Sequence, residues 1–433
     1  MSLKSGYLYA TLLIGVILFI SSCKKEVENE RPQIFIISPS SSQAFQILDT
    51  IIVSATVSDD QEVKNVEVTL VDEFFVKVGH TVTIQINKAE STFTVEYIPE
   101  NVDLPTGSYY IEIEALDEEL AKREYVSIFL TELPLTWEGL IFVNGDNSVN
   151  GIDENLQNEF IWTLPFPFKK GAVNNRDHVL LTGNDAAAKV VALNVNSGEI
   201  EWSGEIHGSP ASNYFNHMYY DQDDMVLKVT SKEDEVRQYM GSSGNEFSDI
   251  QIGNQYDVEQ LFSQGGYTYV ELKSLSQEAR ELRVYFSETG SLVDTEFFFG
   301  DIIKMESWGD FEILILANDN DGMAFLSVYS DITSSFSNFN IFEPGAKDMA
   351  VIGGGRVIVT LLDQLIMQDL VNNQIILLES GNTPDYLEYD DVNGYLWTAR
   401  SGNIKQYVPY PWNFVGEVNG STQIKGIFNL YNK

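Results

Sequence analysis

Short runs of alternating apolar and polar residues follow one another along the chain from Pro32 onward. In Val63–Val71, for example, Val66, Val68 and Leu70 fall on one side, which is the period of two residues expected of a half-buried strand. The runs are separated by Gly, Pro, Asn, Asp and Ser, the residues that turns favour. The pattern predicts an all-β protein.

The first part of this pattern, residues 32–134, contains about seven or eight short strand-like runs. That size and rhythm are typical of a β-sandwich. The segment resembles bacterial immunoglobulin-like or fibronectin-like modules, including their opening form Pro-x-Ile-x-Ile-x-Ser-Pro, although it has no Cys…Trp…Cys pattern. The resemblance implies a spacer, with binding through its loops as the alternative. The predicted strands are Gln33–Ile37, Thr50–Val57, Val63–Val71, Phe74–Val78, Thr81–Ile86, Thr92–Ile98, Tyr109–Leu116 and Tyr125–Leu130.

From residue 137 onward a longer period appears, marked by a turn near the end of each unit. Three strong turns contain Gly198, Gly244 and Gly290, each followed by an alternating run. Corresponding turns are about 40 to 46 residues apart, a period typical of propeller blades with four strands each. Residues 137–433 therefore predict a seven-bladed β-propeller. Weaker turns that complete the series are Leu156-Gln157, Ser334-Ser335, Asn372-Asn373 and Pro411-Trp412.

The two ends of this segment predict that its C-terminal strand closes the ring. The first unit starts directly at Leu140–Val143 and lacks an innermost strand, whereas the last unit is complete by Val418. The remaining run Thr422–Phe428 would supply the missing strand. Closure of this kind hides sheet edges that would otherwise invite aggregation.

Two of the repeats resemble known propeller families. Val190–Trp202, which reads VVALNVNSGEIEW, resembles the repeat of quinoprotein-type (PQQ-like) propellers, in which a strand reading ALD, a Thr/Ser-Gly turn and a Trp recur. Asn393–Arg400, which reads NGYLWTAR, is similar to the Leu-Trp strand of regulator-type propellers. The resemblance implies an architecture, in which the turn glycine takes a positive φ and Trp202 and Trp397 fill space between blades.

The N-terminus has the features of a processing signal. Lys4 precedes the apolar run Leu8–Ile20, which is too short for a comfortable transmembrane span, so residues 1–23 have the layout of a secretory signal. The ending Ile20-Ser21-Ser22-Cys23 resembles the bacterial lipobox, which implies a lipoprotein signal peptide and lipidation of Cys23. An ordinary cleaved signal with an incidental cysteine, or an N-terminal membrane anchor, is the alternative.

Residues 24–31 follow as a short charged tether. Lys24, Lys25 and Glu26 resemble the export signal of Bacteroidetes surface lipoproteins, although Val27 interrupts its acidic pair. The resemblance implies a lipid-anchored protein of the outer membrane, on its cell-surface or periplasmic face. A flexible tether without an export signal is the alternative.

The composition of the chain limits the classes of partner that it can bind. The chain has 64 Asp and Glu against 26 Lys and Arg, a formal net charge of −38. This charge would repel phosphate backbones and anionic membrane surfaces, so we expect no nucleic-acid binding and membrane attachment through the N-terminal lipid only. A lone cysteine can build neither a disulfide scaffold nor a Cys-based metal site.

The sequence predicts no catalytic, cofactor-binding or metal-binding residue. Asn318-Asp319-Asn320-Asp321-Gly322 resembles part of a calcium loop, but Ala317 and Val328 stand where further acidic ligands would be needed, and Asp-rich turns are expected between strands. Asp221-x-Asp223-Asp224 is a weaker turn of the same kind. His207 and His217 could face one funnel opening, but a zinc site needs a third ligand.

The aromatic clusters Pro165–Phe168 and Tyr407–Trp412 would suit stacking on sugar rings or a peptide, but packing between blades is the favoured interpretation. We expect a non-enzymatic, lipid-anchored binding or scaffold protein of the cell envelope, without a cofactor, whose propeller recognises a protein or glycan partner. The alternative is a propeller enzyme, either a quinone-dependent dehydrogenase or a polysaccharide hydrolase or lyase that uses acidic residues in the central funnel.

Overall fold

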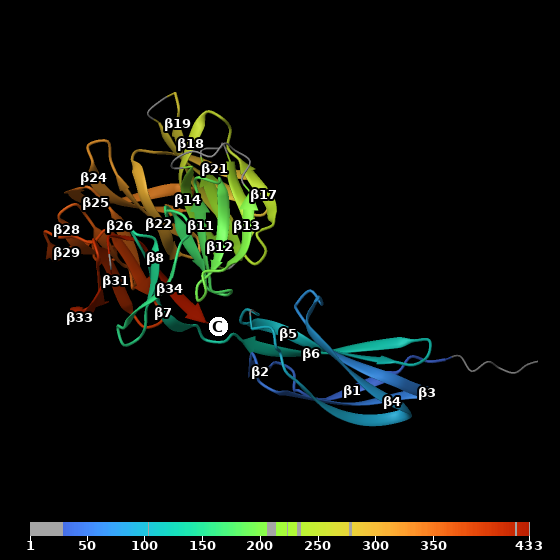
Figure 1. Cartoon of the computed structure of the whole chain (residues 1–433). Coiled ribbons are helices and arrows are strands. Elements are labelled where there is room, and N and C mark those ends of the chain that lie inside the picture. Colours follow the sequence, from blue (N-terminus) through green and yellow to red (C-terminus); the bar gives the residue numbers. More distant parts are fainter. Residues whose placement is uncertain are drawn as a thin grey trace, which may run out of the picture. The chain divides into compact units, whose positions relative to one another are not determined.

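The computed structural model describes residues 29–432 apart from 103, 206–213, 223, 232–234, 277–278 and 421. Within these ranges every regular secondary-structure element is a β-strand, and the strands are numbered β1 to β34. This confirms the all-β prediction (Figure 1). The chain divides between Pro134 and Leu135 into an N-terminal and a C-terminal unit. Nothing in the described ranges forms a helix long and apolar enough to cross a membrane. The predicted signal at residues 1–23, including Cys23, lies outside the described residues.

The N-terminal unit is one connected sheet with the strand order β1-β3-β5-β6-β2, and β4 pairs with β3 off this path. The first half of β3 pairs with β1 and its second half with β5, while β4 pairs along both halves. The sheet therefore changes partners along a single strand. The strands are β1 (Gln33–Ser38), β2 (Gln43–Gln46), β3 (Ile51–Val71), β4 (Lys77–Tyr97), β5 (Gly107–Leu116) and β6 (Ala121–Thr131).

The prediction of seven or eight short strands in this unit is wrong. The predicted runs Thr50–Val57 and Val63–Val71 are one continuous strand, β3, because the polar residues between them form an irregular stretch of pairing rather than a turn. The runs Thr81–Ile86 and Thr92–Ile98 likewise belong to the single strand β4. Phe74 and Phe75, predicted to begin a strand, lie in the β3–β4 turn. The short strand β2, which pairs in parallel with β6, was not predicted.

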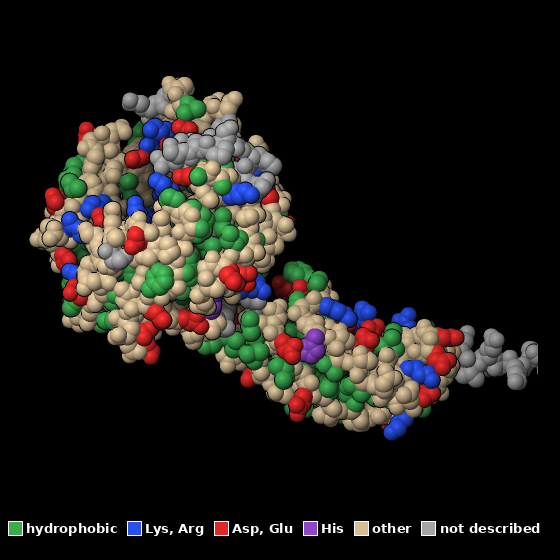
Figure 2. Space-filling view, viewed as in Figure 1, with side chains coloured by type: hydrophobic (Ala, Val, Ile, Leu, Met, Phe, Trp, Pro, Cys, Tyr) green, Lys and Arg blue, Asp and Glu red, His purple; other side chains and the backbone are tan. Residues whose placement is uncertain are grey.

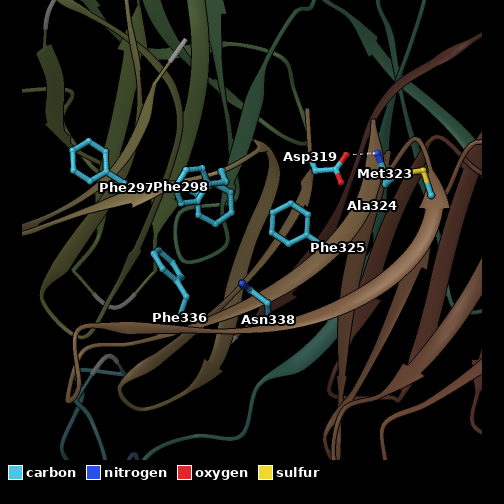
Figure 3. Close-up of a pocket in the computed structure, with 9 residues that line it drawn as sticks. Phe297, Phe298, Asp319, Met323, Ala324, Phe325, Phe336 and Asn338 are labelled. Atoms are coloured by element: carbon cyan, nitrogen blue, oxygen red, sulfur yellow. Dashed lines mark hydrogen bonds between the residues drawn. The ribbon is translucent and has the colours of Figure 1, made fainter. Parts of the chain in front are cut away.

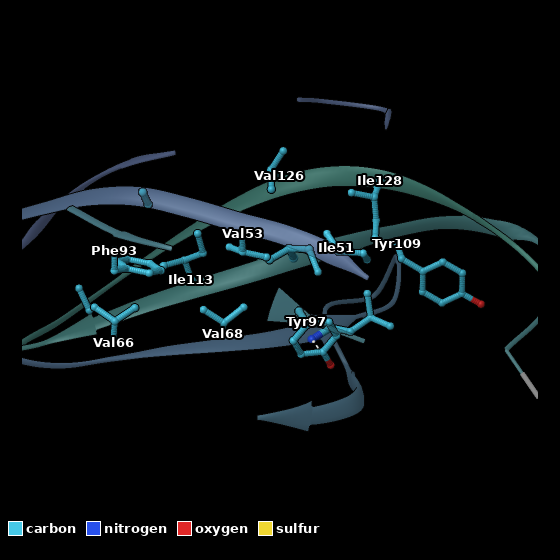
Figure 4. Packing of buried hydrophobic residues seen from close by; sticks show 14 of the residues in the cluster. Ile51, Val53, Val66, Val68, Phe93, Tyr97, Tyr109, Ile113, Val126 and Ile128 are labelled. Atoms are coloured by element: carbon cyan, nitrogen blue, oxygen red, sulfur yellow. Dashed lines mark hydrogen bonds between the residues drawn. The ribbon is translucent and has the colours of Figure 1, made fainter. Parts of the chain in front are cut away.

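Apolar side chains fill the interior of this unit (Figure 4). Val66, Val68 and Leu70, predicted to share one side of a strand, are all buried there. Tyr97 is buried as well, and its hydroxyl donates to the His80 carbonyl (2.9 Å) and accepts from the Leu70 amide (3.2 Å). The polar atom that this ring carries into the core is therefore satisfied, as buried polar groups generally are.

The C-terminal unit consists of seven four-stranded antiparallel sheets, and six of them use four consecutive strands. The strands of these six sheets are β10 (Gly171–Asn174), β11 (Val179–Asn184), β12 (Lys189–Asn194) and β13 (Ile200–Glu205); β14 (Phe215–Asp221), β15 (Val226–Ser231), β16 (Glu235–Met240) and β17 (Glu246–Gln251); β18 (Tyr256–Gln264), β19 (Tyr267–Ser274), β20 (Arg280–Phe286) and β21 (Leu292–Phe298); β22 (Asp301–Gly309), β23 (Glu312–Asn318), β24 (Met323–Ser330) and β25 (Ser335–Pro344); β26 (Asp348–Gly353), β27 (Arg356–Thr360), β28 (Gln364–Asp369) and β29 (Gln374–Ser380); and β30 (Tyr386–Asp390), β31 (Tyr395–Arg400), β32 (Asn403–Pro409) and β33 (Trp412–Asn419).

The seventh sheet has the order β34-β7-β8-β9, so the last strand of the chain pairs with the first strand of this unit. β34 (Ile424–Asn432) runs antiparallel to β7 (Thr136–Asn144), with Phe428 opposite Ile141. β8 (Ser148–Ile152) and β9 (Asn158–Thr163) complete the sheet. The first strands of successive sheets, β10, β14, β18, β22, β26 and β30, contact one another in that order, and β34 contacts both β30 and β10.

Candidate functional sites

Charged and amide side chains from four of these first strands lie together, and we call them the inner-strand cluster: Lys304 and Glu306 on β22, Asp348 on β26, Glu388 on β30 and Asn429 on β34. The Lys304 ammonium lies 2.8 Å from Glu306 Oε1 and 3.0 Å from Asp348 Oδ1, and donates to the Met349 carbonyl (2.7 Å). Burial opposes its charged form, but the carboxylates of Asp348, Glu306 and Glu388 raise the pKa of Lys304 above its ordinary value.

The carboxylates of the cluster also join neighbouring sheets through main-chain amides. Asp348 Oδ2 accepts from the Leu387 amide on β30 (2.6 Å), and Glu306 Oε2 accepts from the Val351 amide on β26 (2.8 Å). Hydrogen bonds of amides to charged carboxylates are stronger than those between neutral groups. These two acids are therefore engaged in holding three successive sheets together.

Glu388 is the least engaged acid of the cluster. Its Oε1 accepts from the amide and the side-chain Nδ2 of Asn429, both at 3.4 Å. Burial raises the pKa of Glu388 to about 7, although Lys304 acts in the opposite direction. Glu388 is therefore the member of the cluster that can exchange a proton near neutral pH.

The inner-strand cluster was missed by the sequence analysis, although the repeat carries a signal for it. Lys304, Asp348, Glu388 and Asn429 follow one another at intervals of 44, 40 and 41 residues, within the period of the predicted units. A search for charged or amide residues at one phase of the repeat would have found these four together. Taken singly, Asp348 and Glu388 do not stand out among the 64 acidic residues of the chain.

Of the two histidines predicted to face one funnel opening, His207 and His217, the structure describes the second. His217 lies on β14, and burial lowers the pKa of its imidazole to about 3, with Lys170 and Lys304 adding to the effect. Its Nδ1 is buried and has no hydrogen-bond partner in the described part of the chain. His207 lies outside the described residues, so the pairing of His207 with His217 remains a prediction.

The other two histidines make local contacts. His80 stacks on Tyr97 in the N-terminal unit, with ring centroids 4.8 Å apart. His178 Nε2 lies 3.2 Å from the Tyr431 carbonyl and 3.3 Å from Glu138 Oε2.

The residues that resembled a calcium loop form the turn between β23 and β24. Asp319 Oδ1 accepts from the amides of Asp321 (2.9 Å) and Met323 (2.8 Å), so this carboxylate closes the turn. Across the residues that the structure describes, no three His, Cys, Asp or Glu side chains are grouped so as to hold a metal ion. Asp223, from the weaker acidic turn, lies outside those residues.

The predicted aromatic clusters are largely packed inside the protein. Phe168 is buried and lies edge-on to Phe428 of β34, with centroids 6.3 Å apart. Tyr407 is buried and stacks on Trp412 at 4.2 Å. Tyr410 is exposed, with the Arg356 guanidinium 4.2 Å above its ring.

The tryptophans of the two repeat motifs fill space between strands of different sheets. Trp202 of β13 lies against Gly244 of the next sheet and donates from Nε1 to the Gly241 carbonyl at 2.8 Å. Trp397 of β31 is buried and stacks on Trp137 of β7 at 5.8 Å. Both contacts are the packing role that the resemblance implied.

An exposed aromatic site lies between the sheets β18–β21 and β22–β25 (Figure 3). We call it the phenylalanine groove; it encloses about 380 Å³. It is lined by Phe297, Phe298 and Phe299 at the end of β21, by Asp319, Met323, Ala324 and Phe325 at the start of β24, and by Phe336 and Asn338 of β25.

The rings of the phenylalanine groove are held in two different ways. Phe298 is buried, stacks on Phe325 (5.7 Å) and lies edge-on to Phe336 (5.4 Å), so it forms a rigid wall. Phe297 and Phe299 are 64% and 81% exposed. A groove with fixed rings inside and exposed rings at its rim can cover an apolar or ring-shaped ligand without refolding.

Comparison with known proteins identifies the N-terminal fold. A family model described as "Bacterial Ig domain" matches residues 32–113, so the chain contains a bacterial immunoglobulin-like domain there. This match confirms the predicted immunoglobulin-like module. No curated protein matches the chain.

Solved structures identify the class of the C-terminal fold. A crystal structure of RRP9 WD40 repeats is similar to this chain with a TM-score of 0.50 and 11% sequence identity, over 61% of this chain and 84% of that chain. At this identity the similarity concerns the fold alone. The chain thus combines a bacterial immunoglobulin-like domain with a unit similar in fold to a WD40-repeat propeller.

Proposed function

We propose that this protein is a lipid-anchored binding or scaffold protein of the bacterial cell envelope, in which the C-terminal unit recognises a protein or glycan partner. The observation that carries the proposal is the phenylalanine groove, where two strongly exposed rings border a preformed cavity. Large apolar side chains exposed around a cavity commonly belong to interaction sites.

In the proposed architecture, the seven sheets are the blades of one propeller and β34 closes the ring. The pairing of β34 with β7 and the succession of contacts among first strands support this arrangement. The immunoglobulin-like domain would act as the spacer between the propeller and the anchor.

The proposed anchor is a lipid on Cys23, in the outer membrane. The lipobox-like ending and the charged tether support it, as does the immunoglobulin-like domain, a module common in extracytoplasmic proteins. Metabolic labelling with an alkyne fatty acid should label the protein and fail to label a Cys23→Ser variant. Protease treatment of intact cells would then distinguish the cell surface from the periplasmic face. Equal labelling of both proteins would contradict the lipid anchor.

The binding function is tested by removing the exposed rings. Each buried phenylalanine side chain contributes about 1.5–3 kcal/mol to an interface, so Phe297→Ser together with Phe299→Ser should weaken partner binding by at least about tenfold. The assay is affinity capture from the native envelope, followed by titration of the captured partner. Phe160→Ser is the matched control, because Phe160 is 59% exposed on β9, the outer strand of a different sheet. A partner that binds all three proteins equally would contradict the assignment of the groove.

A propeller enzyme is the second candidate, and the inner-strand cluster is the observation that favours it. Two carboxylates there form ion pairs with one ammonium group, and a third, Glu388, interacts with it through charge and titrates near neutrality. However, Glu306 and Asp348 are engaged by main-chain amides and Lys304. Turnover of a redox dye with added quinone and calcium, or cleavage of polysaccharide, that is lost in Glu388→Gln would support the enzyme and contradict the binding protein.

A further inference from the structure

A second groove of about 580 Å³ lies between the sheets β14–β17 and β18–β21. We call it the interblade groove. Its walls come from the ends of β15, β16 and β17 on one side and from the β18–β19 and β20–β21 turns on the other. The lining residues that the argument uses are Gln238, Phe247, Tyr267, Phe286 and Ser287.

At two other junctions between sheets, a tryptophan lies on the turn glycine of the following sheet. Trp162 of β9 lies against Gly198 and donates to the Val195 carbonyl (2.6 Å). Trp202 lies against Gly244 and donates to the Gly241 carbonyl (2.8 Å). In both cases the accepting carbonyl is three residues before the turn glycine.

At the interblade groove the corresponding residue is a serine; in two further sheets it is Asp294 and Gly416. Trp162 pairs with Val149 and Trp202 with Ala192, each next to an irregularity in the pairing of the last two strands. In the next sheet the same position, opposite Gln238 and next to the same irregularity, is Ser248. The side chain at this junction is therefore a hydroxymethyl group instead of an indole.

At this junction a glutamine donates the hydrogen bond that an indole N–H donates at the other two. The carbonyl three residues before Gly290 belongs to Ser287, and it accepts from Gln238 Nε2 at 2.8 Å. The same nitrogen donates to Ser248 Oγ (2.8 Å). Gly290 itself is covered by the main chain of Asp249 and Ile250, so the space left open lies beside the Ser287 carbonyl.

Gln238, which lines the groove, carries a buried hydrogen-bond acceptor. Gln238 is fully buried, and its Oε1 has no hydrogen-bond partner among the described residues. Next to it, Ser287 Oγ accepts from the fully buried Lys228 ammonium (2.9 Å), which also contacts Ser263 and Thr268. A buried acceptor without a partner is unfavourable, and a hydrogen bond donated by a ligand would remove that cost.

The walls of the groove are aromatic. Tyr267 and Phe286 stack on each other with centroids 5.2 Å apart, and Phe247 lies on the opposite side, from β17. Phe286 and Phe247 are both exposed. Aromatic walls around a single buried acceptor match a flat ring that carries one N–H or O–H donor.

We propose that the interblade groove binds an aromatic side chain with a ring donor, tryptophan or tyrosine, presented by a partner peptide. The chain itself supplies the argument for this occupant, because it fills the corresponding place at two other junctions with its own indoles. The bound ring lies between Phe247 and the Tyr267–Phe286 stack, with its donor directed at the Gln238 amide. This site is separate from the phenylalanine groove, so it goes beyond the proposed function and can fail or succeed independently of it.

The test is ligand-detected NMR with the purified chain and N-acetyl-tryptophanamide as the probe. We expect saturable binding that exceeds that of N-acetyl-leucinamide by at least about tenfold. Ser248→Trp should fill the groove from within and abolish the binding, whereas the matched variant Ser248→Ala leaves the groove open and retains it. Thermal melting of each variant establishes that it is folded.

A second variant keeps the test decisive if Ser248→Trp does not fold. Phe247→Ser removes one wall from the protein surface and should weaken binding of the probe at least about fivefold, whereas Phe414→Ser, an exposed ring on the outer strand β33, should not. Equal binding of both amides, binding unchanged in a folded Ser248→Trp protein, or binding of N-acetylglucosamine in place of the tryptophan probe would overturn the proposal.

Discussion

Single residues at the turns between the third and fourth strands determine how neighbouring sheets meet. Gly198, Gly244 and Gly290 have φ values of +72°, +67° and +65°, a conformation that favours glycine. At Gly198 and Gly244 the absence of a side chain also makes room for a tryptophan ring of the preceding sheet. Backbone conformation and packing therefore both require glycine at these two turns.

We expect Gly244→Ala to destabilise the protein more than a comparable change elsewhere. An added Cβ would lie 2.2 Å from Cε3 of Trp202, in addition to the strain of the positive φ, so we expect a loss of about 2–4 kcal/mol in the free energy of unfolding. Gly322→Ala is the matched control, since Gly322 has φ +79° but its Cβ would meet nothing within 4 Å; here we expect about 1 kcal/mol. Urea unfolding at equilibrium measures both, and equal losses would contradict the packing argument.

Glu388 predicts a dependence of stability on pH. Because burial raises its pKa to about 7 from 4.5, the folded protein binds more protons than the unfolded chain between these values. Stability should therefore fall as pH rises from about 4.5 to 7, by an amount on the order of 1–3 kcal/mol, and level off above the folded pKa. Glu388→Gln keeps an acceptor for Asn429 but cannot ionise, so its unfolding free energy should fall less over this range. Superimposable pH profiles of the two proteins would contradict this prediction.

These two examples show what a sequence can predict about single positions. The turn glycines could be located because glycine is chemically unusual and recurs with the repeat. Glu388 could not, because its pKa results from burial beside Lys304, Glu306 and Asp348, which come from two other sheets. The exposure of the Phe297 and Phe299 rings could not be predicted either, because strand alternation does not show which outer strand has an uncovered face.

Among the strands, β34 is the one whose deletion we expect to destabilise the C-terminal unit most. It supplies the first strand of a sheet whose other three strands lie at the beginning of the C-terminal unit. Deleting residues 422–433 should therefore expose β7 and unfold this whole unit. Circular dichroism melting and size-exclusion chromatography measure the outcome, with deletion of residues 24–28, ahead of β1, as the control. A truncated protein that stays folded and monomeric would contradict the closure of the ring.

The two units differ in how far their strands could be predicted. In the C-terminal unit, turns with left-handed residues separate the strands at regular intervals, and the sequence shows them clearly. In the N-terminal unit, the polar residues around Asp59 and Asn87 resemble turns but lie within the continuous strands β3 and β4. A polar interruption of a strand and a true turn have the same composition, and only the pairing partners distinguish them.

The net charge of the chain predicts how its stability responds to salt. On the face shown in Figure 2, acidic side chains are scattered over both units rather than gathered in one patch. A net charge of −38 produces self-repulsion that salt screens over about 10 Å at 0.1 M.

We therefore expect the melting temperature at pH 7 to rise by a few degrees between about 10 and 300 mM sodium chloride. Near pH 4.2, the isoelectric point calculated from the sequence, the same salt step should have little effect, which makes it the control. A melting temperature that is independent of salt at pH 7 would show that the acidic residues do not repel one another enough to matter.

The pairing of β34 with β7 also affects the order in which the molecule can form. A ribosome makes the chain from its N-terminus, so β7, β8 and β9 are complete about 260 residues before their fourth strand begins. The immunoglobulin-like domain can fold while synthesis continues. In the first sheet of the C-terminal unit, by contrast, the edge of β7 stays unpaired until β34 has been synthesised. We expect this interval, between the appearance of β7 and that of β34, to be the period in which the nascent chain depends most on chaperones.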